Sequence, residues 1–219
     1  MSTTIPSTDG AALCVGNIFC VGHNYVAHIH ELGALQRSHP MIFIKPTSAL
    51  CLQGQDIQLP SFSHNVHYEA ELVLRIGKGG KNISAEAATA HISHVGIGLD
   101  LTARDVQDVA KKNGLPWAIS KGFDNAACLS PLLPISAVPD LQQLTYTLHV
   151  NGEQRQRGNV PLMIFSPTAI IQYLSSIFTL QEGDLIYTGT PHGVGPIHAG
   201  YDLQLDLGGL LKANFHVAG

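Results

Sequence analysis

The sequence is short of charged and aromatic residues, which make up 13% and 6% of its 219 residues. Its 12 Lys and Arg residues are fewer than its 16 Asp and Glu residues, so the formal net charge is −4. Nucleic-acid-binding proteins usually carry an excess of basic residues, so this balance argues against a nucleic-acid partner. Hydrophobic residues make up 45% of the chain, which is unlike the composition of a disordered protein.

Long hydrophobic runs are also missing. No run approaches the roughly 18 apolar residues of a transmembrane helix. No Lys or Arg precedes Arg37, so the basic start of a secretory signal peptide is absent. We therefore expect a cytoplasmic protein with no membrane partner. A chain of this length favours one domain, which we expect to span residues 16–219 after a leader or edge segment at 1–15.

Motifs of several common sites are missing too. The sequence has no P-loop, no Gly-x-Ser-x-Gly and no His-Glu-x-x-His. Two histidine pairs at i, i+3 are weak candidates for zinc, because no cysteine lies at zinc-finger spacing; they are His64 with His67 and His91 with His94. The four cysteines form no Cys-x-x-Cys pair, and we expect reduced thiols that are mostly buried; they are Cys14, Cys20, Cys51 and Cys128.

Short apolar runs and turn residues divide the chain into many strands and a few short helices. Strands are expected at 18–21, 41–44, 66–76, 95–99 and 185–187 and near the C-terminus. Helices are expected at Tyr25–Leu32, at 84–91, from a capping Thr102 to about Lys112, and after Ser166-Pro167. Asn151-Gly152 favours a type I′ hairpin turn. Because strands and helices do not alternate regularly, we expect an α+β fold with a mixed sheet.

Two carboxylates lie two residues apart in the strand expected at 66–76. Alternate side chains of a strand share a face, so Glu69 and Glu71 emerge side by side, opposite an apolar face. Such a pair repels itself unless a cation or a proton lies between the two groups. Two interpretations stay open: a solvated strand face, which is the ordinary case, or the wall of a cavity.

Asp100 follows the apolar, Gly-containing strand expected at 95–99. It is either an acid at the N-terminus of the next helix, where it would interact favourably with the helix dipole, or a third carboxylate beside Glu69 and Glu71. Three carboxylates would make an all-oxygen site, and such a site selects Mg²⁺ or Mn²⁺ over Zn²⁺.

His28 and Glu31 are neighbours on the short helix expected after Asn24, because they are three residues apart. Such a pair is most often a solvated helix face, but a carboxylate beside an imidazole also suits a general base. The Gly-rich segment 188–195 has two interpretations as well. It is either a tight connecting loop or a set of backbone amides that bind a carboxylate.

Seven stretches follow one another along the chain and carry a resemblance to a known family. They are GHNYVAHIHELG (22–33), IFIKPTSAL (42–50), VHYEAEL (66–72), GIGLDLTARDVQ (96–107), GLPWAISKGFDN (114–125), LHVNGEQRQRGN (148–159) and GDLIYTGTPHGVGP (183–196). Together they resemble the fumarylacetoacetate hydrolase family. The resemblance is closest to its short members, which are acylpyruvate hydrolases with oxaloacetate decarboxylase side activity.

The resemblance implies a mixed β-sandwich or roll with short helices, usually as a homodimer, in which 16–219 is the catalytic domain. It also implies site residues. Mg²⁺ or Mn²⁺ would be held by Glu69, Glu71 and Asp100. His28 and Glu31 would form a dyad on a lid helix, and Lys121 would be the third catalytic residue. The substrate-binding positions would be Arg104, Gln107, Thr190 and His23, the last standing where family members often carry Arg.

The implied reaction is hydrolysis of a 3-acylpyruvate to pyruvate and a carboxylic acid. The small-molecule substrate would chelate the metal through its carboxylate and 2-oxo group, and His28 would activate a water molecule. Two alternatives stay open. The same site could mainly decarboxylate or tautomerise oxaloacetate, or the chain could be a metal-dependent 2-oxo acid binding protein without turnover.

Overall fold

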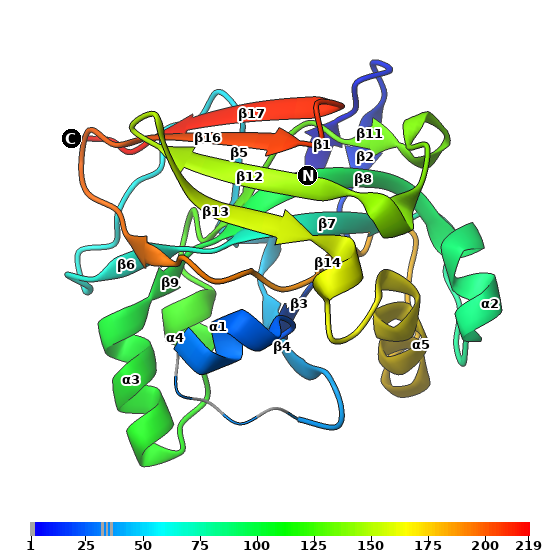
Figure 1. Ribbon diagram of the computed structural model, residues 1–219, viewed down its shortest axis with the longest axis horizontal. Coiled ribbons are helices and arrows are strands. Elements are labelled where there is room, and N and C mark those ends of the chain that lie inside the picture. The colour runs from blue at the N-terminus through cyan, green and yellow to red at the C-terminus, as the bar shows by residue number, and fades with distance from the viewer. Residues whose placement is uncertain (1–2, 32, 34, 36) are drawn as a thin grey trace.

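A large mixed sheet forms the centre of the molecule (Figure 1). The computed structural model describes residues 3–31, 33, 35 and 37–219. Within them, the strand order of this sheet is β4-β3-β14-β7-β8-β10-β5, with β11 beside β8. Only the pairs β3–β14 and β5–β10 are parallel in the described part of this sheet. Its strands are β3 (Ile18–Gly22), β4 (Met41–Lys45), β5 (Leu50–Leu52), β7 (Ala70–Ile76), β8 (Ile92–Asp100), β10 (Ala127–Leu129), β11 (Leu133–Pro134) and β14 (Leu185–Tyr187).

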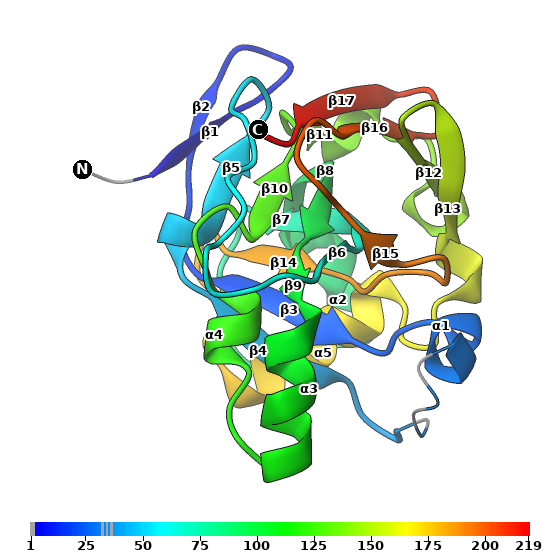
Figure 2. The ribbon, with the colours of Figure 1, turned by 90° about the vertical axis from the view of Figure 1, so that its left-hand side faces the viewer.

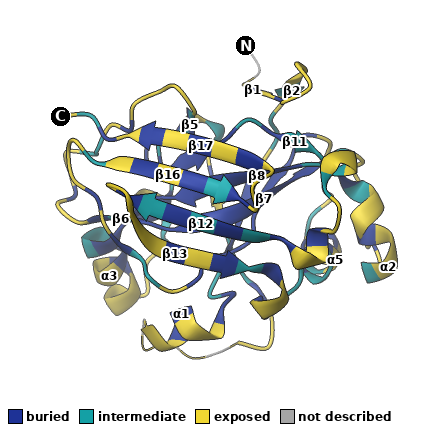
Figure 3. Ribbon diagram, turned by 45° about the horizontal axis from the view of Figure 1, so that its top comes forward, coloured by how far each residue is buried: buried dark blue, intermediate teal, exposed yellow. Residues whose placement is uncertain are grey.

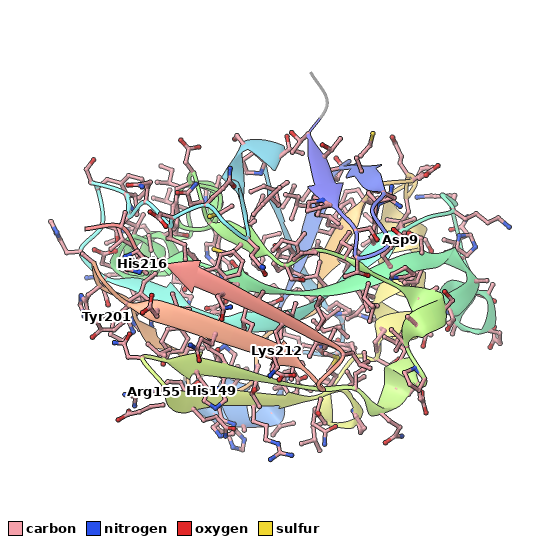
Figure 4. The ribbon with its side chains drawn as sticks, turned by 90° about the horizontal axis from the view of Figure 1, so that it is seen from above. Asp9, His149, Arg155, Tyr201, Lys212 and His216 are labelled. Atoms are coloured by element: carbon pink, nitrogen blue, oxygen red, sulfur yellow. The ribbon has the colours of Figure 1, made fainter. Side chains whose placement is uncertain are left out.

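A second, antiparallel sheet packs over β7 and β8, in the order β13-β12-β16-β17. Its strands are β12 (Thr145–Val150), β13 (Glu153–Asn159), β16 (Asp202–Leu207) and β17 (Leu211–His216). Buried residues alternate with exposed residues along β16 and β17 and with half-buried residues along β12 (Figure 3), as expected for strands with one face on the core. Figure 4 looks onto the outer face, where His149, Lys212 and His216 are labelled.

Two smaller sheets complete the strands. The order β15-β6-β9 joins Gly195–Pro196, Val66–Tyr68 and Thr102–Ala103. β1 (Thr4–Pro6) and β2 (Ala12–Cys14) form a hairpin, and the backbone of Thr8 just beyond β1 hydrogen-bonds to that of Leu132.

The helices are short. They are α1 (Val26–Glu31), α2 (Ala85–Ala88), α3 (Arg104–Asn113), α4 (Ala118–Lys121) and α5 (Pro167–Ile177), with 3₁₀ turns at Thr47–Ala49, Thr89–His91, Ile135–Ala137, Leu141–Gln143 and Val160–Leu162. In Figures 1 and 2, α1, α3 and α4 lie in the lower part of the molecule, where α4 contacts β4 and β9 and α3 contacts β9. None of the described helices is long and apolar enough to cross a membrane.

The α+β class with mixed sheets is confirmed, and so are most local expectations. Asn151 and Gly152 both have positive φ, at 50° and 83°, as a type I′ turn requires. Ser166 caps α5 by accepting from the Ala169 amide at 3.2 Å. The cysteines are free thiols, and only Cys14 is exposed.

Two local expectations are wrong. The strand expected at 66–76 is divided into β6 and β7 at Glu69. Thr102 does not cap a helix, because its hydroxyl donates to the Asp100 carbonyl at 3.3 Å and its backbone belongs to β9; α3 starts two residues later. The first helix is described as far as Glu31. Its expected end at Leu32 lies outside the described residues.

Candidate active site

Three carboxylates meet where β7 and β8 lie side by side. Glu69 and Glu71 flank the start of β7, and the Asp100 amide bonds to the Glu69 carbonyl at 2.8 Å, so the end of β8 is beside them. One oxygen of each carboxylate lies within 4.8 Å of the others, and the three residues are 5%, 1% and 1% exposed. The burial of Glu69 and Glu71 excludes the solvated strand face. Asp100 is not the acid at a helix N-terminus, because it ends β8 and α3 begins only at Arg104.

Three cations surround two of these carboxylates. The Lys121 ammonium lies 2.7 Å from Glu69 and 2.9 Å from Asp100. Arg104 contacts the other oxygen of Glu69 at 2.5 Å, and Lys45 lies 2.8 Å from Asp100. Lys45 also donates to the Leu101 and Lys121 carbonyls. These cations offset most of the negative charge on Glu69 and Asp100.

Glu71 has far less compensation. The hydrogen bond that it accepts comes from the Gly189 amide at 2.7 Å. Burial, followed by the charges of Asp100 and Glu69, raises the pKa of Glu71 well above its ordinary value. Burial also acts to raise the pKa of Glu69, but Lys121 and Arg104 outweigh it and lower that pKa. The cluster thus contains one carboxylate that an added cation would stabilise strongly.

The donor set fits a hard divalent cation. All three groups offer carboxylate oxygens, which Mg²⁺ and Mn²⁺ prefer. Asp100 Oδ1 is buried and makes no hydrogen bond of good geometry among the described groups, although the Lys45 ammonium is near. Neither candidate histidine pair, His64 with His67 or His91 with His94, belongs to a cluster of ligands in the described part of the chain.

The expected dyad is formed on α1. His28 Nδ1 and Glu31 Oε2 are 2.9 Å apart, and His28 is buried. The other oxygen of Glu31 accepts from the Gly193 amide at 2.9 Å. This contact joins α1 to the Gly-rich segment 188–195. Glu31 is exposed, but His28 is buried, so the histidine does not belong to a solvated helix face.

The same segment approaches the cluster through Gly189. Its φ is 101°, and a Cβ there would lie 2.6 Å from the Cβ of Asn24, so only glycine fits. The segment has a tight backbone, and two of its amides donate to carboxylates of the chain itself, those of Glu31 and Glu71.

Most of the expected site residues line one cavity. Of the ten positions named from the sequence, Glu31 and Asp100 do not line it, and the other eight do: His23, His28, Glu69, Glu71, Arg104, Gln107, Lys121 and Thr190. Arg104 also donates to Gln107 at 2.7 Å, which orients the two α3 side chains together. The remaining walls include Met41, Phe43, Lys111 and Trp117.

Two residues at the site were not expected from the sequence. Gln156 of β13 donates to Thr190 Oγ1 and to the Pro191 carbonyl, both at 2.9 Å, and accepts from the Ala70 amide. It ties the 188–195 loop to β7, and nothing in its local sequence indicates this. The position of Lys45 at the end of an apolar strand could have indicated an anionic partner, since a lysine is rarely buried without one.

Comparison with known proteins decides the family. The family described as "Fumarylacetoacetate (FAA) hydrolase C-terminal" matches residues 17–218. The chain belongs to the fumarylacetoacetate hydrolase family. The resemblance inferred from its motifs is thus confirmed, and the chain is an enzyme of this family with a cluster suited to a metal ion.

Relatives within the fumarylacetoacetate hydrolase family carry more than one activity in their names. The mitochondrial oxaloacetate tautomerase FAHD1 of Bos taurus is 42% identical over 201 residues, covering 92% of this chain and 91% of that protein. The oxaloacetate tautomerase YcgM of Escherichia coli is 43% identical over 196 residues, covering 89% and 90%. The crystal structure of a fumarylpyruvate hydrolase from Pseudomonas aeruginosa, in complex with Mn²⁺ and pyruvate, has a TM-score of 0.95 at 37% identity, covering 99% and 96%.

Proposed function

We propose that this enzyme uses a divalent cation to interconvert the keto and enol forms of oxaloacetate. The observation that carries the proposal is the shared cavity, which the His28 imidazole, the Lys121 ammonium and the carboxylates of Glu69 and Glu71 all line. A base, a cation and a set of metal ligands are the groups that proton transfer beside a carbonyl requires. Relatives named as oxaloacetate tautomerases, at 41–43% identity, favour oxaloacetate as the substrate.

Glu69, Glu71 and Asp100 would hold the cation, with Mg²⁺ as our first choice and Mn²⁺ as the alternative. When bound, it would act as a Lewis acid that polarises the 2-oxo group and acidifies the hydrogens on C3. The buried position of Glu71 beside two other carboxylates supports this assignment, because a cation would relieve their repulsion.

The proton transfer is assigned to His28. Its Nδ1 is hydrogen-bonded to Glu31, which leaves Nε2 as the nitrogen that takes a proton from C3 of the keto acid. Return of that proton to the oxygen on C2 gives the enol, and the reverse sequence gives the keto acid. Glu31 is a positioning residue, because its other oxygen is held by the Gly193 amide.

Negative charge develops on the C2 oxygen as the proton leaves C3. Lys121 and Arg104 both line the cavity and are already held in place by Glu69. Prearranged cations stabilise such a charge without reorganising during the reaction. Gln107 and Thr190 are assigned to substrate orientation, the first supported by its bond with Arg104 and the second by its bond with Gln156.

The test is an assay of enol-oxaloacetate conversion, followed by ultraviolet absorbance, with Mg²⁺, with Mn²⁺ and with a chelator. Pyruvate release is measured in parallel with a coupled dehydrogenase. We expect metal-dependent loss of the enol far faster than in buffer, with slower pyruvate release. A conversion rate equal to that of buffer with either metal would refute the proposal.

Hydrolysis of 3-acylpyruvates is the second candidate, and the dyad favours it. A histidine oriented by a carboxylate can activate water to attack the C4 carbonyl, which splits the C3–C4 bond and leaves pyruvate and a carboxylic acid. The similar fumarylpyruvate hydrolase structure also supports it. Acetylpyruvate and fumarylpyruvate in the same pyruvate assay distinguish the candidates, since rapid cleavage without rapid tautomerisation would favour hydrolysis. Decarboxylation of oxaloacetate would appear as pyruvate release from oxaloacetate alone.

We also propose a homodimer and a cytoplasmic location, as expected from the sequence and the resemblance. Light scattering coupled to gel filtration measures the mass of the particle, and a value near the monomer mass of 23.4 kDa would contradict the dimer. Fractionation of the source cells tests the location.

A further inference from the structure

Lys111 lines the cavity but has no part in the chemistry above. It lies on α3, one turn after Gln107 and two turns after Arg104, and residues at this spacing share one face of a helix. All three side chains line the cavity. The Lys111 ammonium lies 5.5 Å from the centre of the Trp117 ring, which also lines the cavity. The aromatic face therefore holds this ammonium at the rim.

The Lys111 ammonium has no carboxylate within ion-pair distance among the residues that the structure describes. Partial burial, and then the charge of Arg104, lower the pKa of Lys111, whereas Asp108 and Glu69 act to raise it. A cation next to other cations is stabilised when an anion arrives. A negatively charged ligand group beside Lys111 would therefore be bound favourably.

We infer that Lys111 binds a second carboxylate of the substrate and selects 2-oxo dicarboxylic acids over 2-oxo monocarboxylic acids. This inference rests on the proposed function, because it concerns the substrate of the same site. Oxaloacetate and fumarylpyruvate belong to the selected class, and acetylpyruvate does not. The metal cluster would take the 2-oxo acid end, and Lys111 would take the other end at the rim.

The test is calorimetric binding of two inert ligands to the Mg²⁺-loaded enzyme. (S)-Malate and (S)-lactate share a 2-hydroxy acid end and neither enolises readily, but only malate has a second carboxylate. We expect wild type to prefer malate, and Lys111→Gln to bind malate about tenfold more weakly with lactate binding unchanged, as loss of one charged contact predicts. Lys111→Arg should retain the preference. Lys112→Gln, the control on the same helix, removes a lysine that does not line the cavity and should change nothing.

Three results would overturn the inference: wild type does not prefer malate or does not bind it, Lys111→Gln keeps full affinity for malate, or the variant loses both ligands equally. The proposed function is judged separately. Tautomerisation by wild type, with malate binding independent of Lys111, would refute only the role of Lys111. Lys111-dependent malate binding without any conversion of oxaloacetate would refute only the proposed function.

Discussion

At the residue scale, two glutamates that are almost adjacent in the sequence have opposite electrostatic environments. Glu69 contacts Lys121 and Arg104, and its pKa is lowered, whereas Glu71 accepts from one backbone amide and its pKa is raised. The difference comes from residues that are distant in the sequence. A carboxylate pair on one strand therefore acquires its chemistry from the helices and loops that cover it.

The first residue-scale prediction concerns His28. His28→Ala removes the base, so tautomerisation and any acylpyruvate hydrolysis should fall by about 10²-fold or more. Decarboxylation of oxaloacetate should fall less, because it needs neither an activated water molecule nor removal of a proton from C3. Steady-state kinetics on the three reactions measure this. Glu31→Gln keeps the imidazole and should lose less activity, and unchanged Mg²⁺ affinity in both variants excludes damage to the cluster. Near-wild-type rates for His28→Ala would disprove its role as the base.

The second residue-scale prediction concerns pH. Burial, and then the charge of His28, lower the pKa of His23 from 6.5 to about 4. Between these values the unfolded chain binds a proton at this position and the folded chain does not, so the free energy of unfolding falls as the pH drops. Replacing His23 by Gln removes this proton uptake. Urea unfolding at about pH 7 and about pH 5 should therefore show a smaller loss of stability in the variant. Equal losses in both proteins would contradict the lowered pKa.

At the element scale, features set by neighbouring residues could be predicted from the sequence. The hairpin at Asn151-Gly152 and the start of α5 at Ser166 depend on local backbone preferences and caps, and both are as expected. The capping role of Thr102 failed because a non-local strand pairing, β6 with β9, takes its backbone into a sheet. At Thr102 the pairing of β9 with β6 therefore outweighs the local preference of threonine for a helix cap.

The sequence could predict which carboxylates and which histidine lie together, but not the electrostatics around them. The motifs indicated the three carboxylates and the dyad, whose members the structure brings together. Lys45 and Gln156 could not be assigned to the site. Their partners lie on other strands and loops, and no regular spacing in the sequence connects them to those partners. The sequence left two interpretations of Glu69 and Glu71 open, a solvated strand face and a cavity wall, because a periodic pattern does not show what covers a strand. The burial of both residues excludes the solvated face.

The element-scale prediction concerns β8, the strand that ends at Asp100. A Cβ on Gly98 would overlap the Cys128 carbonyl of the paired strand β10 and lie 2.8 Å from the Tyr187 ring. Gly98→Ala should lower the free energy of unfolding by about 3 kcal/mol, since the backbone of β10 has to move. The matched control is Gly96→Ala, whose nearest contacts are movable side chains of Leu132 and Ser130; about 1 kcal/mol is expected there. Chemical unfolding measures both, and equal losses would contradict the backbone clash.

At the scale of the whole molecule, the site is built from many separate elements of the fold. Its residues come from both large sheets, from α1, α3 and α4, and from the 188–195 loop. A ligand that binds only this assembled arrangement stabilises the entire folded chain by mass action. Metal binding should therefore be measurable as global stability, without any substrate.

The whole-molecule prediction uses this linkage. Saturation at about 100 times the dissociation constant adds about 2.7 kcal/mol, so Mg²⁺ or Mn²⁺ should raise the melting temperature of a 219-residue chain by about 5–10 °C. Glu71→Gln keeps an oxygen for the Gly189 amide but removes the buried charge. Its metal-free melting temperature should equal or exceed that of wild type, and its metal-dependent rise should be lost. Asp56→Asn, at an exposed carboxylate outside the cluster, should keep the full rise. If Glu71→Gln keeps the rise as well, Glu71 is not a metal ligand, because a ligand cannot be neutralised without loss of affinity.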